Sequence, residues 1–241
     1  MNHTAANKNK AISPPGWVVL AVLFVSIPVL IISGTVNIYA HSPGLYEYGF
    51  NKYDISAATG ISNSQLDEVA RNMVDYFNGR LPSPQMTVEA WGKSRLLYNQ
   101  KELTHLEDVR YIISVFKILQ TAAVLAFLAA GAAAFALLGM RRLLRGILAG
   151  CIATLAFMAL LVIWSLIDFN SLFYLFHVLS FSNELWLLDP STDYLIRMFT
   201  ESFFYDAAIM VTVTIIVEAV VLGAAALVIE KTMLVKSDRA V

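Results

Sequence analysis

Two histidines are the side chains of this sequence best suited to chemistry. His105 lies between two acidic residues, with Glu102 three positions before it and Asp108 three positions after it. Because residues three apart share a helix face, either carboxylate could orient the imidazole and stabilise its cation. His177 lies in an otherwise apolar stretch, where desolvation lowers the pKa of an imidazole and makes it a better neutral base. Such a pair could share base and acid roles.

The common catalytic motifs are missing from the sequence. It has no HExxH zinc motif, no GxSxG nucleophile elbow, no phosphate-binding P-loop and no CxxC pair. Its single cysteine, Cys151, excludes an internal disulfide and a cysteine metal cluster, and we interpret it as a packing residue. His41 is a third candidate histidine. The alternative interpretation of His105 and His177 is that both are interfacial residues bonded to backbone or water.

The composition indicates the environment of these side chains. The 241 residues are 58% hydrophobic and 15% charged, whereas soluble domains have about 45–50% and about 25%. A chain of this size cannot bury that much apolar surface in one soluble core, and it is too apolar to be disordered. A formal net charge of −1 provides no general basic field for nucleic acid. The sequence therefore predicts an integral membrane protein.

Four apolar blocks are long enough to cross a bilayer as helices, which takes about 20 residues each. We predict spans at residues 17–39, 111–140, 146–167 and 207–229. Basic side chains flank them at Lys8, Lys10, Arg141, Arg142, Arg145, Lys231, Lys236 and Arg239. Because positive flanks stay inside, the tails 1–16 and 230–241 and the turn 141–145 are predicted to be cytoplasmic. The segments 40–110 and 168–206 then lie outside.

These two outer segments carry the candidate residues. The first is predicted to be a small extracytoplasmic domain with an amphipathic helix that starts near Ser62 and ends at Asn78-Gly79. From Glu102 the chain is expected to be helical and to continue into the second span. The second outer segment contains an apolar stretch at 172–188 with polar residues that lipid disfavours. We interpret this stretch as re-entrant or interfacial. The fold class is thus mainly α, with four transmembrane helices.

At these residues the chain resembles the bacterial lipoprotein intramolecular transacylases, the Lit family. The resemblance covers nearly the whole chain and follows the order span, outer domain, two spans, outer loop, span. Its motifs are residues 53–79, residues 102–110 (Glu-Leu-Thr-His-Leu-Glu-Asp-Val-Arg) and, most specifically, residues 176–190 (Phe-His-Val-Leu-Ser-Phe-Ser-Asn-Glu-Leu-Trp-Leu-Leu-Asp-Pro), continuing to Phe204. One departure is Thr200, where the family is expected to have proline before Glu201.

The resemblance implies a reaction on a diacylated lipoprotein in the bacterial cell membrane, with the active site at the outer face. The enzyme would move the acyl chain of the middle glycerol carbon to the α-amine of the same N-terminal cysteine. The product would be a lyso-form lipoprotein. In this family the histidines that match His105 and His177 are the essential ones.

The residues themselves fit such a reaction, because aminolysis of an ester needs a base, an oxyanion stabiliser and a proton donor. We expect His105, oriented by Glu102 or Asp108, to act as the base, and His177 to donate to the glycerol oxygen. The reverse assignment and a covalent acyl-imidazole both remain open. Further candidates for binding the oxyanion or the peptide are Asn183, Tyr98, Arg110 and Trp186.

Two other classes of function compete with this hypothesis. A non-catalytic membrane sensor or assembly protein would need no paired histidines, so the distance between the two imidazoles discriminates it. A metalloenzyme would need both histidines and nearby carboxylates to form a ligand set. We expect no cofactor, no metal and no nucleic-acid partner. The sequence does not indicate the oligomeric state.

Overall fold

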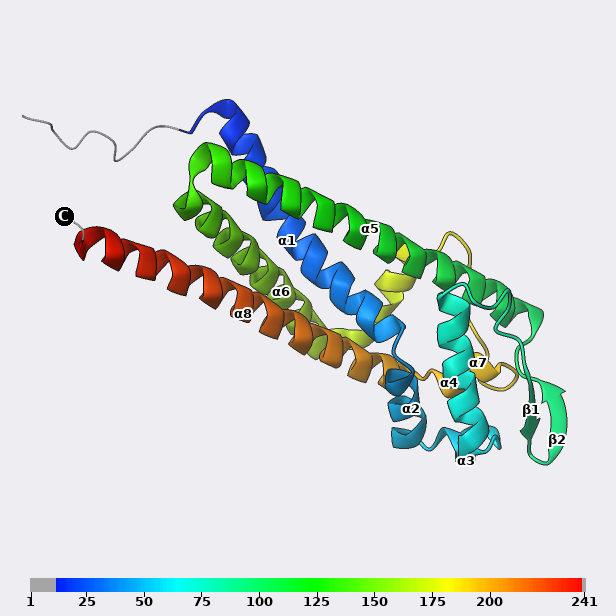
Figure 1. The fold of residues 1–241 in the computed structure, drawn as a ribbon. Helices are drawn as coiled ribbons and strands as arrows, with labels where there is room; N and C mark the ends of the chain where they lie inside the picture. Colours follow the sequence, from blue (N-terminus) through cyan, green and yellow to red (C-terminus); the bar gives the residue numbers. More distant parts are fainter. Residues whose placement is uncertain (1–11, 240–241) are drawn as a thin grey trace, which may run out of the picture. The chain divides into compact units, whose positions relative to one another are not determined.

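The computed structural model describes residues 12–239 and is dominated by four long helices (Figure 1). These are α1 (Pro14–Ala40), α5 (Gln100–Leu138), α6 (Met140–Ser180) and α8 (Glu201–Arg239). All four are long and apolar enough to cross a membrane, which confirms the predicted fold class. Lys8 and Lys10 lie outside the described residues, as do the side chains of Lys236 and Arg239.

The chain divides into two compact units, and the long helices contribute to both of them. Unit 1 comprises Met1–Ile31, Gln120–Phe157 and Ile216–Val241. In it, Gly150 of α6 lies so close to Ile27 of α1 that an added Cβ would come within 2.8 Å of that side chain. Small residues of this kind allow apolar helices to approach closely. Arg141 and Arg145 both pair with Glu230, at 3.0 and 2.8 Å.

Unit 2 comprises Ile32–Leu119 and Met158–Ile215, and it holds all the short elements. They are α2 (Pro43–Lys52), α3 (Ile55–Thr59), α4 (Asn63–Phe77), α7 (Tyr194–Met198) and the antiparallel hairpin β1 (Thr87–Ala90) and β2 (Lys93–Leu96). A core of buried apolar side chains joins them to the start of α5; its fully buried members include Ile61, Leu66, Met73, Leu97 and Met198.

Helix α4 is the amphipathic helix that the sequence predicts. Leu66, Val69, Met73 and Phe77 are buried along one face, at the spacing of a helix that covers a core. Gly79 follows with a φ of 76°, a conformation that glycine adopts without strain. Ser62 occupies the N-cap position, but its hydroxyl bonds to Ser64 rather than to a helix N–H.

The hairpin was not predicted from the sequence, although its turn has a recognisable geometry. Trp91 and Gly92 separate the two strands and have φ angles of 56° and 71°. Positive φ at both central residues defines a type I′ turn, whose twist matches that of the strands. The bulky Trp91 at the first position hides the usual Asn-Gly signal. Its ring packs against Gly60, where an added Cβ would lie 2.5 Å from the indole.

Helices α5, α6 and α8 extend well beyond the predicted spans. Helix α5 has 39 residues and is therefore about 58 Å long, whereas the hydrocarbon layer is about 30 Å thick. Its first turns, from Gln100 to Arg110, pack into the core of unit 2 through Leu106. Helix α6 breaks at Asp168, whose carboxylate accepts a hydrogen bond from the N–H of Ser171 at 3.0 Å and so restarts the helix. The interfacial position of the segment after this break stays a prediction.

The described packing of α2 against α8 in unit 2 can be tested by substitution. A Cβ added at Gly49 would lie 2.2 Å from the ring of Phe203, which is buried and stacked on Tyr46. Gly49→Ala is therefore expected to lower the free energy of unfolding by about 1–3 kcal/mol through overpacking. Thermal unfolding in micelles measures this change.

Gly44 provides the control in the same helix, because an added Cβ there would meet only the Ser42 hydroxyl, at 3.7 Å. Gly44→Ala should leave stability unchanged or raise it slightly, since alanine favours helix more than glycine does. Equal stabilities of the two variants would contradict the described packing of α2.

Candidate active site

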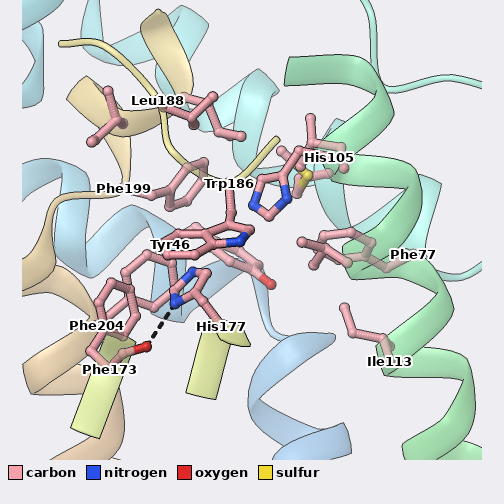
Figure 2. A pocket seen from close by; sticks show the side chains of 15 residues that line it. Tyr46, Phe77, His105, Ile113, Phe173, His177, Trp186, Leu188, Phe199 and Phe204 are labelled. Atoms are coloured by element: carbon pink, nitrogen blue, oxygen red, sulfur yellow. Dashed lines mark hydrogen bonds between the residues drawn. The ribbon is translucent and has the colours of Figure 1, made fainter. Parts of the chain in front are cut away.

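Unit 2 contains a cavity of about 180 Å³ that brings the two histidines together (Figure 2). His105 projects from α5 and His177 from α6, and their ring centroids lie 6.5 Å apart with the planes inclined by 28°. These residues are 72 positions apart in the chain. Most of the other lining side chains are apolar or aromatic, including Phe77, Ile113, Leu188, Phe199 and Phe204.

The backbone fixes the orientation of His177. Its Nδ1 lies 2.7 Å from the carbonyl oxygen of Phe173, one helical turn earlier (Figure 2). Because a carbonyl oxygen only accepts, Nδ1 carries the hydrogen and donates it, and the neutral ring keeps its lone pair on Nε2. The rings of Phe173 and Trp186 enclose the imidazole at centroid distances of 4.4 and 4.9 Å. Burial lowers the pKa of His177, although the bond to Phe173 opposes this effect.

His105 lies on the protruding part of α5 and is 7% exposed. Burial, and secondarily the neighbouring His177, lower the pKa of His105, so its ring is neutral at physiological pH. The rings of Phe181 and His105 meet edge to face, with their centroids 5.1 Å apart. Among the described residues, no group forms a hydrogen bond with its buried Nδ1. Both tautomers of His105 are therefore open to a substrate.

The Glu102 carboxylate bonds to backbone N–H groups, and within the described residues no hydrogen bond joins it to His105, which the sequence suggested it could orient. The carboxylate accepts hydrogen bonds from the N–H of Asn99 at 2.7 Å and of Leu195 at 2.6 Å. The Asn99 side chain accepts in return from the N–H of Glu102 at 3.0 Å. This reciprocal pair is a capping box, and the spacing Asn-x-x-Glu in the sequence could have revealed it. Asn99 also donates to Asp193, so the cap ties the start of α5 to the start of α7.

Asp108 and Asn183 are bonded to each other rather than to a histidine. The Asn183 amide donates to the Asp108 carboxylate at 2.9 Å, and the Asn183 side-chain oxygen accepts from the N–H of Leu185 at 3.0 Å. The indole N–H of Trp186 donates to the Asn183 carbonyl oxygen at 2.9 Å. These bonds hold the turn that places Trp186 against His177. The two polar residues thus position an aromatic wall of the cavity.

The remaining candidates lie elsewhere in unit 2. The Tyr98 ring is buried in the core, and the Arg110 guanidinium lies 4.7 Å from the ring centroid of Tyr76. Neither residue lines the cavity. His41 is also outside it, with Nδ1 donating to the carbonyl oxygen of Asn37 at 2.7 Å. The carbonyl at position 37 precedes His41 by one helical turn.

Several cavity residues escaped the sequence analysis because nothing polar marks them. On α5, Val109 and Ile113 follow His105 at intervals of four residues and line the cavity with it. The four-residue spacing, which puts side chains on one helix face, is the only signal they give. Within the described part of the chain, no group of three His, Cys, Asp or Glu residues is placed to hold a metal ion.

The sequence of this chain matches a known protein family. The family model of the lipoprotein intramolecular transacylase Lit matches residues 21–204. The chain belongs to the Lit family. No curated protein sequence matches it significantly.

Solved Lit structures support the fold. The membrane-integral Lit from Bacillus cereus superposes with a TM-score of 0.74 and is 23% identical, with 94% of this chain and 99% of that chain covered. A variant of that protein with a histidine replaced by arginine gives a TM-score of 0.73 at 20% identity, with 94% of each chain covered. This Lit family member is therefore an acyltransferase and a multi-pass membrane protein with four apolar helices.

The capping box makes Glu102 a positioning residue. Substituting Glu102 distinguishes this role from a direct action on His105. Glu102→Ala leaves the N–H of Leu195 without its acceptor and is expected to lower the free energy of unfolding by about 1–3 kcal/mol. Glu107→Ala, an exposed change on the same helix, is the control and should be neutral. Chemical denaturation measures both. Wild-type stability of Glu102→Ala, with a shifted pH profile of activity, would instead indicate that Glu102 acts on the imidazole.

Proposed function

We propose that this Lit protein transfers the acyl chain of the middle glycerol carbon of a diacylglyceryl-modified lipoprotein to the α-amine of the same N-terminal cysteine. The observation that carries the proposal is the pairing of two imidazoles, the buried His105 and the half-buried His177, 6.5 Å apart in an otherwise apolar cavity. A reaction whose ester and amine belong to one molecule gains most from positioning, which converts the attack into an intramolecular step. The product is a lyso-form lipoprotein.

The geometry favours His177 as the base, which reverses the assignment expected from the sequence. Its Nδ1 is bonded to Phe173, so Nε2 can accept a proton from the attacking amine. The new N–C bond forms as the amine attacks the ester carbonyl. His177 then returns that proton to the glycerol oxygen as the C–O bond breaks. Neutral His105 donates an N–H to the developing oxyanion, so the step needs no external acid or base.

The apolar walls of the cavity suit the acyl chain that moves. Val109 and Ile113 extend from His105 along α5, and Phe173 and Phe204 lie on the side of His177. These walls exclude water, which would otherwise compete with the amine for the ester. The positive-inside rule, applied to the charged flanks of the spans, supports an orientation with both termini in the cytoplasm and the cavity at the outer face. Lipoprotein N-termini are anchored at that face.

Histidine variants test the catalytic assignment. His105→Ala and His177→Ala are each expected to reduce lyso-lipoprotein formation by at least about a hundredfold, because each removes a general acid–base or oxyanion group. Mass spectrometry of the lipopeptide product gives the rate.

His41→Ala is the matched control, since this histidine also bonds a backbone carbonyl one turn earlier but lies outside the cavity. It should retain wild-type activity. Full activity in either His105→Ala or His177→Ala would remove that residue from the mechanism.

Narrowing the cavity tests whether it holds the acyl chain. Ile113→Trp fills space eight residues, about two turns, beyond His105. It should slow transfer of long acyl chains while transfer of short chains remains close to the wild-type rate. Competition between substrates of two chain lengths measures the preference.

The adjacent Ile112 provides the control because it lines a different hollow, next to Asp108 and Asn183. Ile112→Trp should keep the wild-type chain preference. An unchanged preference in Ile113→Trp would show that the acyl chain lies elsewhere.

A further inference from the structure

The hairpin of unit 2 has one covered edge and one open edge. At β1, Ile61 bridges Ala90, and the N–H of Trp91 donates to the carbonyl oxygen of Gly60 at 3.2 Å. The side-chain amide of Gln65 also lies 3.2 and 3.3 Å from the backbone N–H and C=O of Glu89. In the described part of the chain, by contrast, no strand pairs with the other side of β2, and its four residues are all exposed.

The register shows which groups face outward from β2. The N–H of Leu97 donates to the carbonyl oxygen of Met86 at 2.9 Å, and the two-residue turn makes Ala90 and Lys93 a bonded pair. Because bonded and non-bonded pairs alternate in an antiparallel ladder, the N–H and C=O groups of Ser94 and Leu96 point away from β1. These are unpaired strand groups of the kind that an extended peptide can join.

A groove of about 360 Å³ is lined by the end of β2 and the start of α5. The groove is lined by Leu96, Asn99 and Glu102, and also by Thr192, just before α7, and Tyr194, the first residue of α7. Glu102 is one helical turn from His105, about 5 Å along α5. Tyr194 is followed directly by Leu195, which lines the histidine cavity. Groove and cavity are thus lined by neighbouring residues of α5 and α7, although no described residue lines both.

We propose that the groove binds the lipoprotein peptide that follows the acylated cysteine, as an added strand on the open edge of β2. This inference rests on the proposed function, because it needs the cysteine to lie at His105 and His177. Because the groove lining includes Glu102, one turn from His105, and an extended chain advances about 3.3 Å per residue, the groove lies within reach of the residues that follow the cysteine. Main-chain pairing reads no side chains, so the site takes lipoproteins of different sequence.

Substrate length tests the site with the unaltered enzyme. A synthetic diacylglyceryl-cysteine peptide of eight residues is expected to have a kcat/KM roughly tenfold above that of a two-residue peptide, about the effect of two backbone hydrogen bonds. The gain should appear in KM. The amides of the long peptide can be N-methylated at its odd or at its even positions. Because only every second N–H of an added strand faces β2, one of these two patterns should abolish the gain in kcat/KM and the other should not. Equal kcat/KM for long, short and methylated peptides would overturn the proposal, whereas no transfer on any of them would refute the proposed function instead.

A proline variant tests whether the higher kcat/KM of the long peptide depends on β2. Leu96→Pro removes the outward N–H, and edge positions of this kind tolerate proline. It should reduce the long peptide to the kcat/KM of the short one and leave the short one unchanged. Thr87→Pro is the matched control, since Thr87 is the cross-strand partner of Leu96 and its N–H faces the other edge. The proposal would be overturned if both variants lost the same amount of kcat/KM on the long peptide only. It would also be overturned if the protein were a dimer that Leu96→Pro dissociates, because the edge would then have another role.

Discussion

The capping box at the start of α5 is the interaction on which the geometry of the site depends. Two stretches of chain more than 90 residues apart, at Glu102 and at Leu195, meet through one carboxylate that accepts a backbone N–H from each side. A buried N–H without an acceptor is unfavourable by about 1–3 kcal/mol, so this contact specifies one arrangement of the two segments. His105 and the walls of the cavity follow from that arrangement.

Burial gives the two histidines their chemical character. An imidazole removed from water is favoured in its neutral form, and a neutral ring can accept a proton at one nitrogen while donating at the other. In His177 the carbonyl of Phe173 decides which nitrogen does which. In His105 no such bond to Nδ1 exists within the described residues, so the protein does not fix its tautomer. The apolar walls of the cavity therefore favour the uncharged form of both imidazoles.

The sequence predicted those features that depend on composition and local spacing. The four long apolar helices and the amphipathic α4 follow from hydrophobic patterning, and the family resemblance pointed to His105 and His177. The Asn-x-x-Glu spacing could have revealed the bond between Asn99 and Glu102. The bonds of Glu102 to Leu195 and of Asp108 to Asn183 could not be inferred, because these partners are distant in sequence and the helix-face rule considers only near neighbours. The hairpin was missed since Trp91 occupies a turn position that usually carries asparagine. Apolar cavity residues such as Phe204 carry no signal that separates them from core residues.

An isotope crossover experiment tests the central claim, that ester and amine of one substrate molecule react inside the histidine cavity. The enzyme is given two forms of one lipopeptide in equal amounts. One form is labelled in both its acyl chains and its peptide, and the other form carries no label. If the ester and the amine of one molecule react, every N-acylated product carries either both labels or neither. Products with one label, at the frequency of random exchange, would contradict that claim.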